Sequence, residues 1–178
     1  MNRAVSQLVE VIRQEIICLE KFLTLLTEEQ ECLVDNEVDS LRRCIQDQEK
    51  TIGEAQKLEE ARIKLTDSLA EKLKIDKGEV NMSKLIELME ESYSTKLREL
   101  QSILFTLYAK LERQRKKNEF LIRQSMKYVD KSMKIFLGLR EGDRGDPISW
   151  EKDRDIHSGN VVKPKGLRLF TAKDRILV

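Results

Sequence analysis

The chain has 178 residues, of which 37% are charged and 5% aromatic, and its formal net charge is +1. This length is compatible with one domain, and the surplus of charged and aliphatic residues favours long helices over a thick globular core. A net charge near zero argues against a protein built mainly to bind nucleic acid. No apolar run approaches the ~20 residues that cross a bilayer, and the N-terminus lacks the continuous apolar region of a secretory signal. We therefore expect a cytoplasmic protein.

The first predicted helix runs from about Arg3 to Leu33. Its apolar residues recur at steps of three and four, which makes one apolar stripe along a helix. The stripe contains Val5, Leu8, Ile12, Ile16, Leu19, Phe22 or Leu23, and Leu26. The segment LVDNEVDSL then predicts a break, with Asn36 as the N-cap of the next helix and Asp39 in its first turn, where a carboxylate is favourable.

The second predicted helix runs from about Glu37 to Leu73, and the short connection makes it an antiparallel neighbour of the first. The residues expected to point inward are Val38, Leu41, Ile45, Ile52, Ala55, Leu58, Leu65 and Leu69. Gly53 lies inside this helix and weakens it by up to ~1 kcal/mol relative to Ala. We interpret Gly53 as a point of close packing against a neighbouring helix rather than as a hinge.

The polar segment IDKGEVNMS predicts a loop over residues 75–83, and Ser83 is the expected cap of a short helix, KLIELMEES. A third long helix follows, with a seam at steps of three and four. The seam residues are Leu97, Leu100, Leu104, Leu107, Leu111, Gln114, Asn118, Leu121, Ser125, Tyr128, Ser132, Ile135 and Leu139. Such 3.5-residue spacing indicates a coiled coil. At 1.5 Å per residue this helix is about 65 Å long, so we expect one end to protrude.

The composition changes after Leu139. Five of the seven glycines and both prolines lie from Gly138 onward, and the polar stretch there has too little apolar surface to offset chain entropy. Residues 140–178 are therefore predicted to be a flexible, disordered tail, although the final LRLFTAKDRILV is apolar enough to order on a partner. Residues 1–139 form the predicted helical domain. The expected fold is all-α, an elongated antiparallel bundle or coiled coil of three long helices plus one short helix.

No group of residues in the sequence predicts catalysis. Cys18, Cys32 and Cys44 lack metal-like spacing and are expected to be reduced thiols. The only histidine, His157, has no metal ligands near it in the sequence. A glycine-rich phosphate loop and a nucleophile motif are also missing. We expect no enzyme activity, no metal and no cofactor.

Basic residues are concentrated between Lys110 and Lys134. Nine Lys/Arg stand there against three acids. A basic helix can contact nucleic acid or an anionic membrane. The alternative, which we favour, is a solvated face or one paired with the acidic EEQE run at residues 28–31.

Two stretches of the sequence carry a resemblance to a known family. NEFLIRQSMKYVDKSMKIFLG places Asn118 before a Leu-Ile pair, and ECLVDNEVDSLRRCIQDQEKTIGEAQKLEEAR places Lys50 before a Leu/Glu-rich run that closes on Arg62. Their order and spacing resemble the FlgN-type flagellar export chaperones over about residues 1–139. The resemblance implies a cytoplasmic chaperone of flagellar type III secretion, which acts in bacterial flagellum biogenesis. Such a chaperone binds the C-terminal helical ends of hook–filament junction proteins (FlgK/FlgL type), prevents their premature assembly and delivers them to the export gate.

The residues of the last predicted helix agree with this implication. Polar residues in a seam specify register at a cost in stability, and a reversible helix-in-groove contact can use that property. The expected substrate contacts are Asn118, Leu121, Ile122, Ser125, Tyr128, Val129, Ser132, Ile135, Phe136 and Leu139. The alternative, without a binding role, is that the polar seam residues face water or a loop.

The tail carries a weaker part of the resemblance. Family members have an aromatic residue, usually Tyr, and then a glycine turn shortly after the last helix, and DPISWEKDRD places Trp150 at the corresponding position. Arg154 stands where the glycine is expected. The resemblance implies an export-gate contact by Trp150.

Two other functions remain open at this point. One is a coiled-coil structural or adaptor protein that self-associates through the same seam. The other is a basic helical module that binds nucleic acid or membrane. A one-to-one complex with a junction-protein segment separates the chaperone from both.

Overall fold

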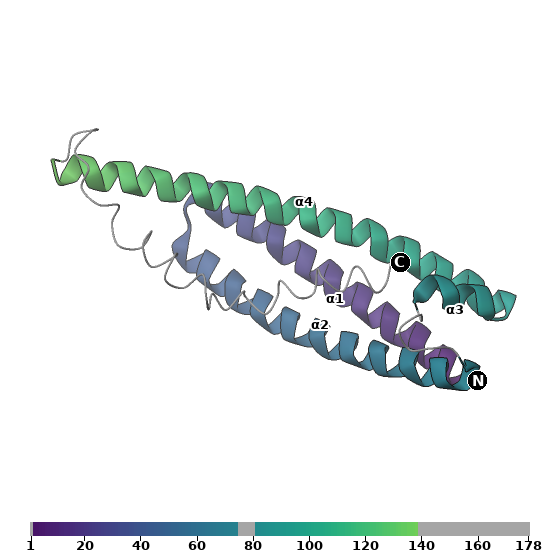
Figure 1. Cartoon of the computed structure of the whole chain (residues 1–178). Helices are drawn as coiled ribbons and strands as arrows, with labels where there is room; N and C mark the ends of the chain where they lie inside the picture. Colours follow the sequence, from purple (N-terminus) through teal and green to yellow (C-terminus); the bar gives the residue numbers. More distant parts are fainter. Residues whose placement is uncertain (1, 75–80, 139–178) are drawn as a thin grey trace.

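A computed structural model of the chain describes residues 2–74 and 81–138. These residues form four helices: α1 (Asn2–Asp35), α2 (Val38–Leu73), α3 (Met82–Leu88) and α4 (Glu91–Phe136). Figure 1 shows an elongated arrangement in which α2 and α4 lie on opposite sides of α1, and the short α3 lies beside the beginning of α4. The described residues contain no strand. The predicted all-α fold of three long helices and one short helix is confirmed.

The direction of the helices follows from the residues that meet across them. α1 and α2 form an antiparallel hairpin, as predicted from their short connection (Figure 1). α4 runs parallel to α1 and therefore antiparallel to α2. Ser6 contacts Tyr93, Glu15 contacts Tyr108, and further along α1 the Leu26 carbonyl accepts from Asn118 of α4.

The core forms around α1, which packs against both α2 and α4. The apolar stripe predicted for α1 is buried throughout, apart from Leu23, which is half-buried beside buried Phe22. The stripe meets Leu69 of α2, the α3 residues Leu85 and Ile86, and the first half of the α4 seam. The buried α4 members of this cluster are Leu97, Leu100, Leu104, Leu107, Tyr108 and Leu111. Burial of such a stripe is the main driving force for joining amphipathic helices.

One buried polar cluster joins all three long helices. The Glu15 carboxylate of α1 accepts from Arg62 Nε of α2 at 3.0 Å and from Tyr108 Oη of α4 at 3.4 Å. Burial raises the pKa of Glu15 above its ordinary value of 4.5, although the Arg62 guanidinium beside it acts in the opposite direction. Burial also raises the pKa of Tyr108, and the charge of Glu15 adds to this effect.

Two predicted helix caps are wrong. Asn36 is not the N-cap of α2; it has φ 58° and ends α1, while the Glu37 N–H donates to the Cys32 carbonyl at 2.9 Å. This pattern closes a helix C-terminus, and Asn tolerates the left-handed backbone there. The cap of α3 is Asn81 rather than Ser83, because Asn81 Oδ1 accepts from the Lys84 N–H at 2.8 Å.

The predictions for α2 fail at three positions. A Cβ on Gly53 meets no atom within 4 Å, so this glycine is not a point of close packing. Val38 and Ile45, expected inside, are 60% and 42% exposed. They lie in the first turns of α2, where α2 packs on α1 but no helix covers its other side.

The end of α4 protrudes, as its predicted length suggested. Asn118 is the last buried residue of α4, and every later residue up to Gly138 is half-buried or exposed. In Figure 1 this end extends beyond the turn between α1 and α2. Within the described ranges, no helix combines the length and hydropathy needed to span a bilayer.

Candidate functional site: an apolar groove beside the end of α4

An apolar groove with a volume of about 570 Å3 lies between the second half of α4 and the hairpin of α1 and α2. Leu33 of α1 and both Leu41 and Ile45 of α2 form one wall. The α4 residues that line it are Ile122, Ser125, Met126, Val129, Asp130 and Met133. Leucine, isoleucine, valine and methionine dominate this lining, so the groove suits an apolar ligand surface.

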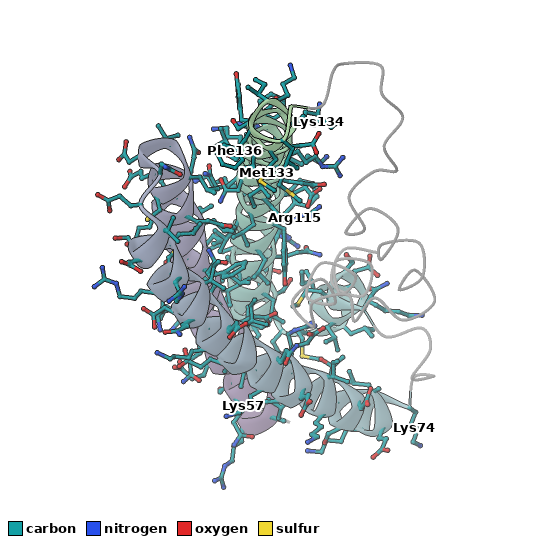
Figure 2. All side chains as sticks on the ribbon, turned by 90° about the vertical axis from the view of Figure 1, so that its left-hand side faces the viewer. Lys57, Lys74, Arg115, Met133, Lys134 and Phe136 are labelled. Carbon is teal, nitrogen blue, oxygen red and sulfur yellow. The ribbon has the colours of Figure 1, made fainter. Side chains whose placement is uncertain are left out.

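The groove continues the buried core of the bundle. In α4 the core face passes from Leu111 to Asn118 and then, at the helical spacing of 3.6 residues per turn, to Ile122, Val129 and Met133. α1 ends at Asp35, so this face of α4 loses its partner helix and becomes open. Figure 2 shows Met133 and Phe136 on the side of α4 that faces α2, and Lys134 on the other side.

A polar layer separates the closed core from the open groove. The Asn118 amide Nδ2 donates to the Leu26 carbonyl at 2.6 Å and to Glu29 Oε2 at 2.8 Å. Gln48 Nε2 donates to the same carboxylate oxygen at 3.0 Å, and Gln114 Nε2 donates to Asn118 Oδ1 at 3.2 Å. Amides and a carboxylate from all three long helices therefore satisfy one another. Satisfied buried networks of this kind fix a single helix register.

The Glu29 carboxylate belongs both to the polar layer and to the groove. Glu29 is only 8% exposed, yet it also lines the groove. Both donors reach its Oε2 atom, and an ionised carboxylate can accept on either oxygen. The groove therefore has one acidic group at its inner end.

Three of the predicted contact residues, Ile122, Ser125 and Val129, line the groove together. Asn118 is 2% exposed and belongs to the polar layer. Leu121 is half-buried and borders a different hollow of α4. The other described members of the predicted set are exposed and outside the groove lining: Tyr128, Ser132, Ile135 and Phe136. Leu139 and Trp150 lie outside the described residues.

The predicted seam and the groove lining differ because their periods differ. A strict 3.5-residue repeat drifts by ~20° per heptad on an ordinary α-helix. Tyr128 and Ile135 lie four and five heptads after Leu100, so they have drifted by about 80° and 100° from its direction. Projection at 3.6 residues per turn selects the neighbouring residues instead.

Sequence reasoning missed five apolar groove residues, besides the acidic Glu29 and Asp130. Met126 and Met133 belong to α4, and Leu33, Leu41 and Ile45 belong to the α1–α2 hairpin. A 3.6-residue projection of α4 finds the two methionines. The hairpin residues become recognisable only once the parallel pairing of α1 and α4 is known, because that pairing sets which turn of α4 faces the α1–α2 connection.

Comparison with known protein families gives a match. The family model described as "FlgN protein" matches residues 1–145. Neither the search of curated proteins nor that of solved structures gives a match to this chain. The family match covers most of the chain and agrees with the resemblance found at Asn118 and in the α1–α2 region. The chain belongs to the FlgN family of flagellar export chaperones.

Proposed function

We propose that this chaperone holds the C-terminal helical ends of hook–filament junction proteins of the FlgK/FlgL type in the groove beside α4. It does so in the cytoplasm, prevents their premature assembly and delivers them to the export gate. The observation that carries the proposal is the continuation of the core face of α4 into an open groove walled by three helices. An amphipathic helix can occupy the place that a further bundle helix would take.

The lining of the groove fits a reversible complex. Met126 and Met133 have flexible, polarisable side chains, which adapt to more than one apolar surface. Val129 is 62% exposed in the free chain, so a docked helix removes apolar surface from water without rearranging the core. The proposed contact is centred on Ile122, Ser125 and Val129, with the exposed Ser132 and Phe136 beside it. Tyr128 and Ile135, which the sequence also suggested, point about 100° and 120° away from Val129 at 100° per residue.

The first prediction concerns the centre of the groove. Ile122→Asp combined with Val129→Asp introduces two charges that a bound apolar helix must desolvate. We expect at least a tenfold loss of affinity for a purified C-terminal segment of a junction protein, measured by isothermal titration calorimetry. Both residues are exposed in the free chain, so its circular dichroism spectrum is expected to stay helical.

A matched control lies on the same helix. Ile103 and Phe105 are also exposed apolar residues of α4 but lie away from the groove. Ile103→Asp with Phe105→Asp adds the same two charges, and its affinity is expected to match the parent chain. Unchanged binding in the groove variant, or equal loss in both variants, contradicts the proposed site. A one-to-one stoichiometry separates capture from self-association.

A further inference from the structure

The second half of α4 carries more positive charge than the described residues neutralise. Its three acids, Glu112, Glu119 and Asp130, already pair within the helix. Their partners are Arg115, Lys116, Arg123 and Lys134. The other five basic residues form no ion pair with any described residue: Lys110, Arg113, Lys117, Lys127 and Lys131. Pairing with the acidic run at residues 28–31 is also not found within the described part of the chain.

Four of these residues follow one line along α4. Arg113, Lys117, Lys127 and Lys131 stand at steps of four, ten and four, which places them in one row on a helix. We call this row, with Phe120 in its middle, the basic stripe. At 100° per residue Lys131 points about 160° away from Val129, so the basic stripe lies on the side of α4 opposite the groove.

The basic stripe also contains an apolar anchor point. Phe120 is 60% exposed. It borders a hollow of about 520 Å3 that is further lined by Gln30, Arg113, Lys116, Lys117 and Leu121. An exposed aromatic beside a hollow, rimmed by cations, offers space for one apolar side chain of a partner and positive charge around it.

Folding does not account for this arrangement. Arg113 with Lys117, and Lys127 with Lys131, are like-charge pairs at spacing i, i+4, which destabilise a helix. Phe120 contributes nothing to the buried core. The stripe therefore weakens the free helix, and a partner of opposite charge removes that cost.

We infer that the basic stripe binds an acidic protein segment that inserts one apolar side chain into the hollow beside Phe120. Charge complementarity favours an acidic partner. The aromatics on this side of α4, Phe120 and Tyr128, stand eight residues apart, whereas single-stranded nucleic acid needs a series of stacking platforms for successive bases. Membrane binding needs a broad apolar face beside the cations, whereas the exposed apolar residues on this side of α4, Phe120, Tyr128 and Ile135, stand seven or eight residues apart. Because the stripe and the groove are on opposite sides of α4, both can be occupied together. That the groove then holds a substrate helix rests on the proposed function.

The test uses the full chain and a defined probe. The probe is a fluorescent 20-residue synthetic helical peptide with glutamates along one face and one central leucine, and its matched partner has glutamine in place of every glutamate. We expect the acidic peptide to bind and the glutamine peptide to bind at least tenfold more weakly by fluorescence anisotropy. Arg113→Glu with Lys117→Glu is expected to weaken the acidic peptide at least tenfold, and Phe120→Ala about fivefold.

The control variant changes the net charge equally on another helix. Lys57 and Lys64 are exposed residues of α2, and Figure 2 shows Lys57 far from the free end of α4. Lys57→Glu with Lys64→Glu is expected to bind the acidic peptide like the parent chain. The groove variant with Asp at positions 122 and 129 is also expected to bind it normally, which keeps this inference separate from the proposed function.

Several outcomes overturn the inference. One is equal loss in the Lys57/Lys64 control, which reduces the effect to overall charge. A second is tighter binding of phosphatidylglycerol vesicles or of a single-stranded DNA oligonucleotide than of the acidic peptide. A third is failure of the acidic peptide to bind at all, and a fourth is its loss in the groove variant, which makes the two surfaces one site.

Discussion

Glu15, Arg62 and Tyr108 place a charged hydrogen-bonded cluster where a bundle of this kind is expected to be apolar. Burying both ions costs solvation free energy, which their mutual attraction only offsets when the geometry is good. Arg62 Nη2 is buried without a hydrogen-bond partner, so the cluster is not fully satisfied. Its value therefore lies more in fixing the register of three helices than in stability.

The second prediction tests this cluster. Glu15→Ala leaves the buried Arg62 without its counter-charge and is expected to lower the free energy of unfolding by about 3–5 kcal/mol. Glu15→Leu with Arg62→Met removes both charges and is expected to be close to neutral or stabilising. Urea denaturation followed by circular dichroism measures both. If the double variant is as unstable as Glu15→Ala, the destabilisation does not come from the unpaired charge of Arg62.

The third prediction is a pH dependence with a defined sign. Because burial raises the pKa of Glu15 above 4.5, the folded state binds this proton more tightly than the unfolded state. The resulting stabilisation is fully present below pH 4.5 and is lost as the pH rises through the raised pKa. Glu15→Gln removes this component. From pH 4 upward, the free energy of unfolding is expected to decline in the parent chain by a component that the variant lacks. Identical pH profiles of the two chains contradict this role of Glu15.

At the scale of elements, α2 offers a simple gain in stability. Gly53 is helical, and a Cβ there meets nothing. Our fourth prediction is that Gly53→Ala raises the free energy of unfolding by about 0.5–1 kcal/mol, because alanine restricts the unfolded chain and favours the helix. Thermal unfolding measures the effect. A destabilised variant contradicts this prediction and indicates that Gly53 permits a bend of α2 or a close contact with another helix.

The helices show which parts of the fold the sequence predicts. The α1 stripe is correct because a local period of 3.6 residues decides which side chains a helix buries. The prediction for Asn36 is wrong because Asn can cap either end of a helix, and the prediction for Ser83 is wrong because Asn81, two residues earlier, is an equally suitable N-cap. The groove lining departs from the 3.5-residue seam because periods of 3.5 and 3.6 residues are indistinguishable over one heptad and separate only over four.

For the whole molecule, holding and delivery are expected to use different parts of the chain. Trp150 lies outside the described residues, and we propose that it contacts the export gate. An aromatic anchor in a polar segment can bind a preformed surface, although ordering the segment costs part of the binding energy. This division leaves the groove free to hold its helix during delivery.

The fifth prediction tests that division. Trp150→Ala is expected to leave the affinity for the junction-protein segment unchanged, because Trp150 is not part of the groove. It is expected to reduce export of the junction proteins and swimming motility. The control is the groove variant with Asp at positions 122 and 129, which is expected to lose affinity for the junction-protein segment. Loss of substrate affinity in Trp150→Ala assigns the tryptophan to the holding site instead.

The polar layer of Asn118 and Glu29 forms the inner end of the groove, and therefore sets the inner limit for the proposed guest helix. Beyond it the space between α1 and α4 is filled, and the part of α4 that lines the groove runs from Ile122 to Met133. That interval spans about 18 Å at 1.5 Å per residue, roughly three turns. In the proposed complex, the rest of a longer helix extends past the groove and stays outside the chaperone. A bound helix held over about three turns can dissociate one turn at a time from its outer end, and the chaperone itself need not unfold.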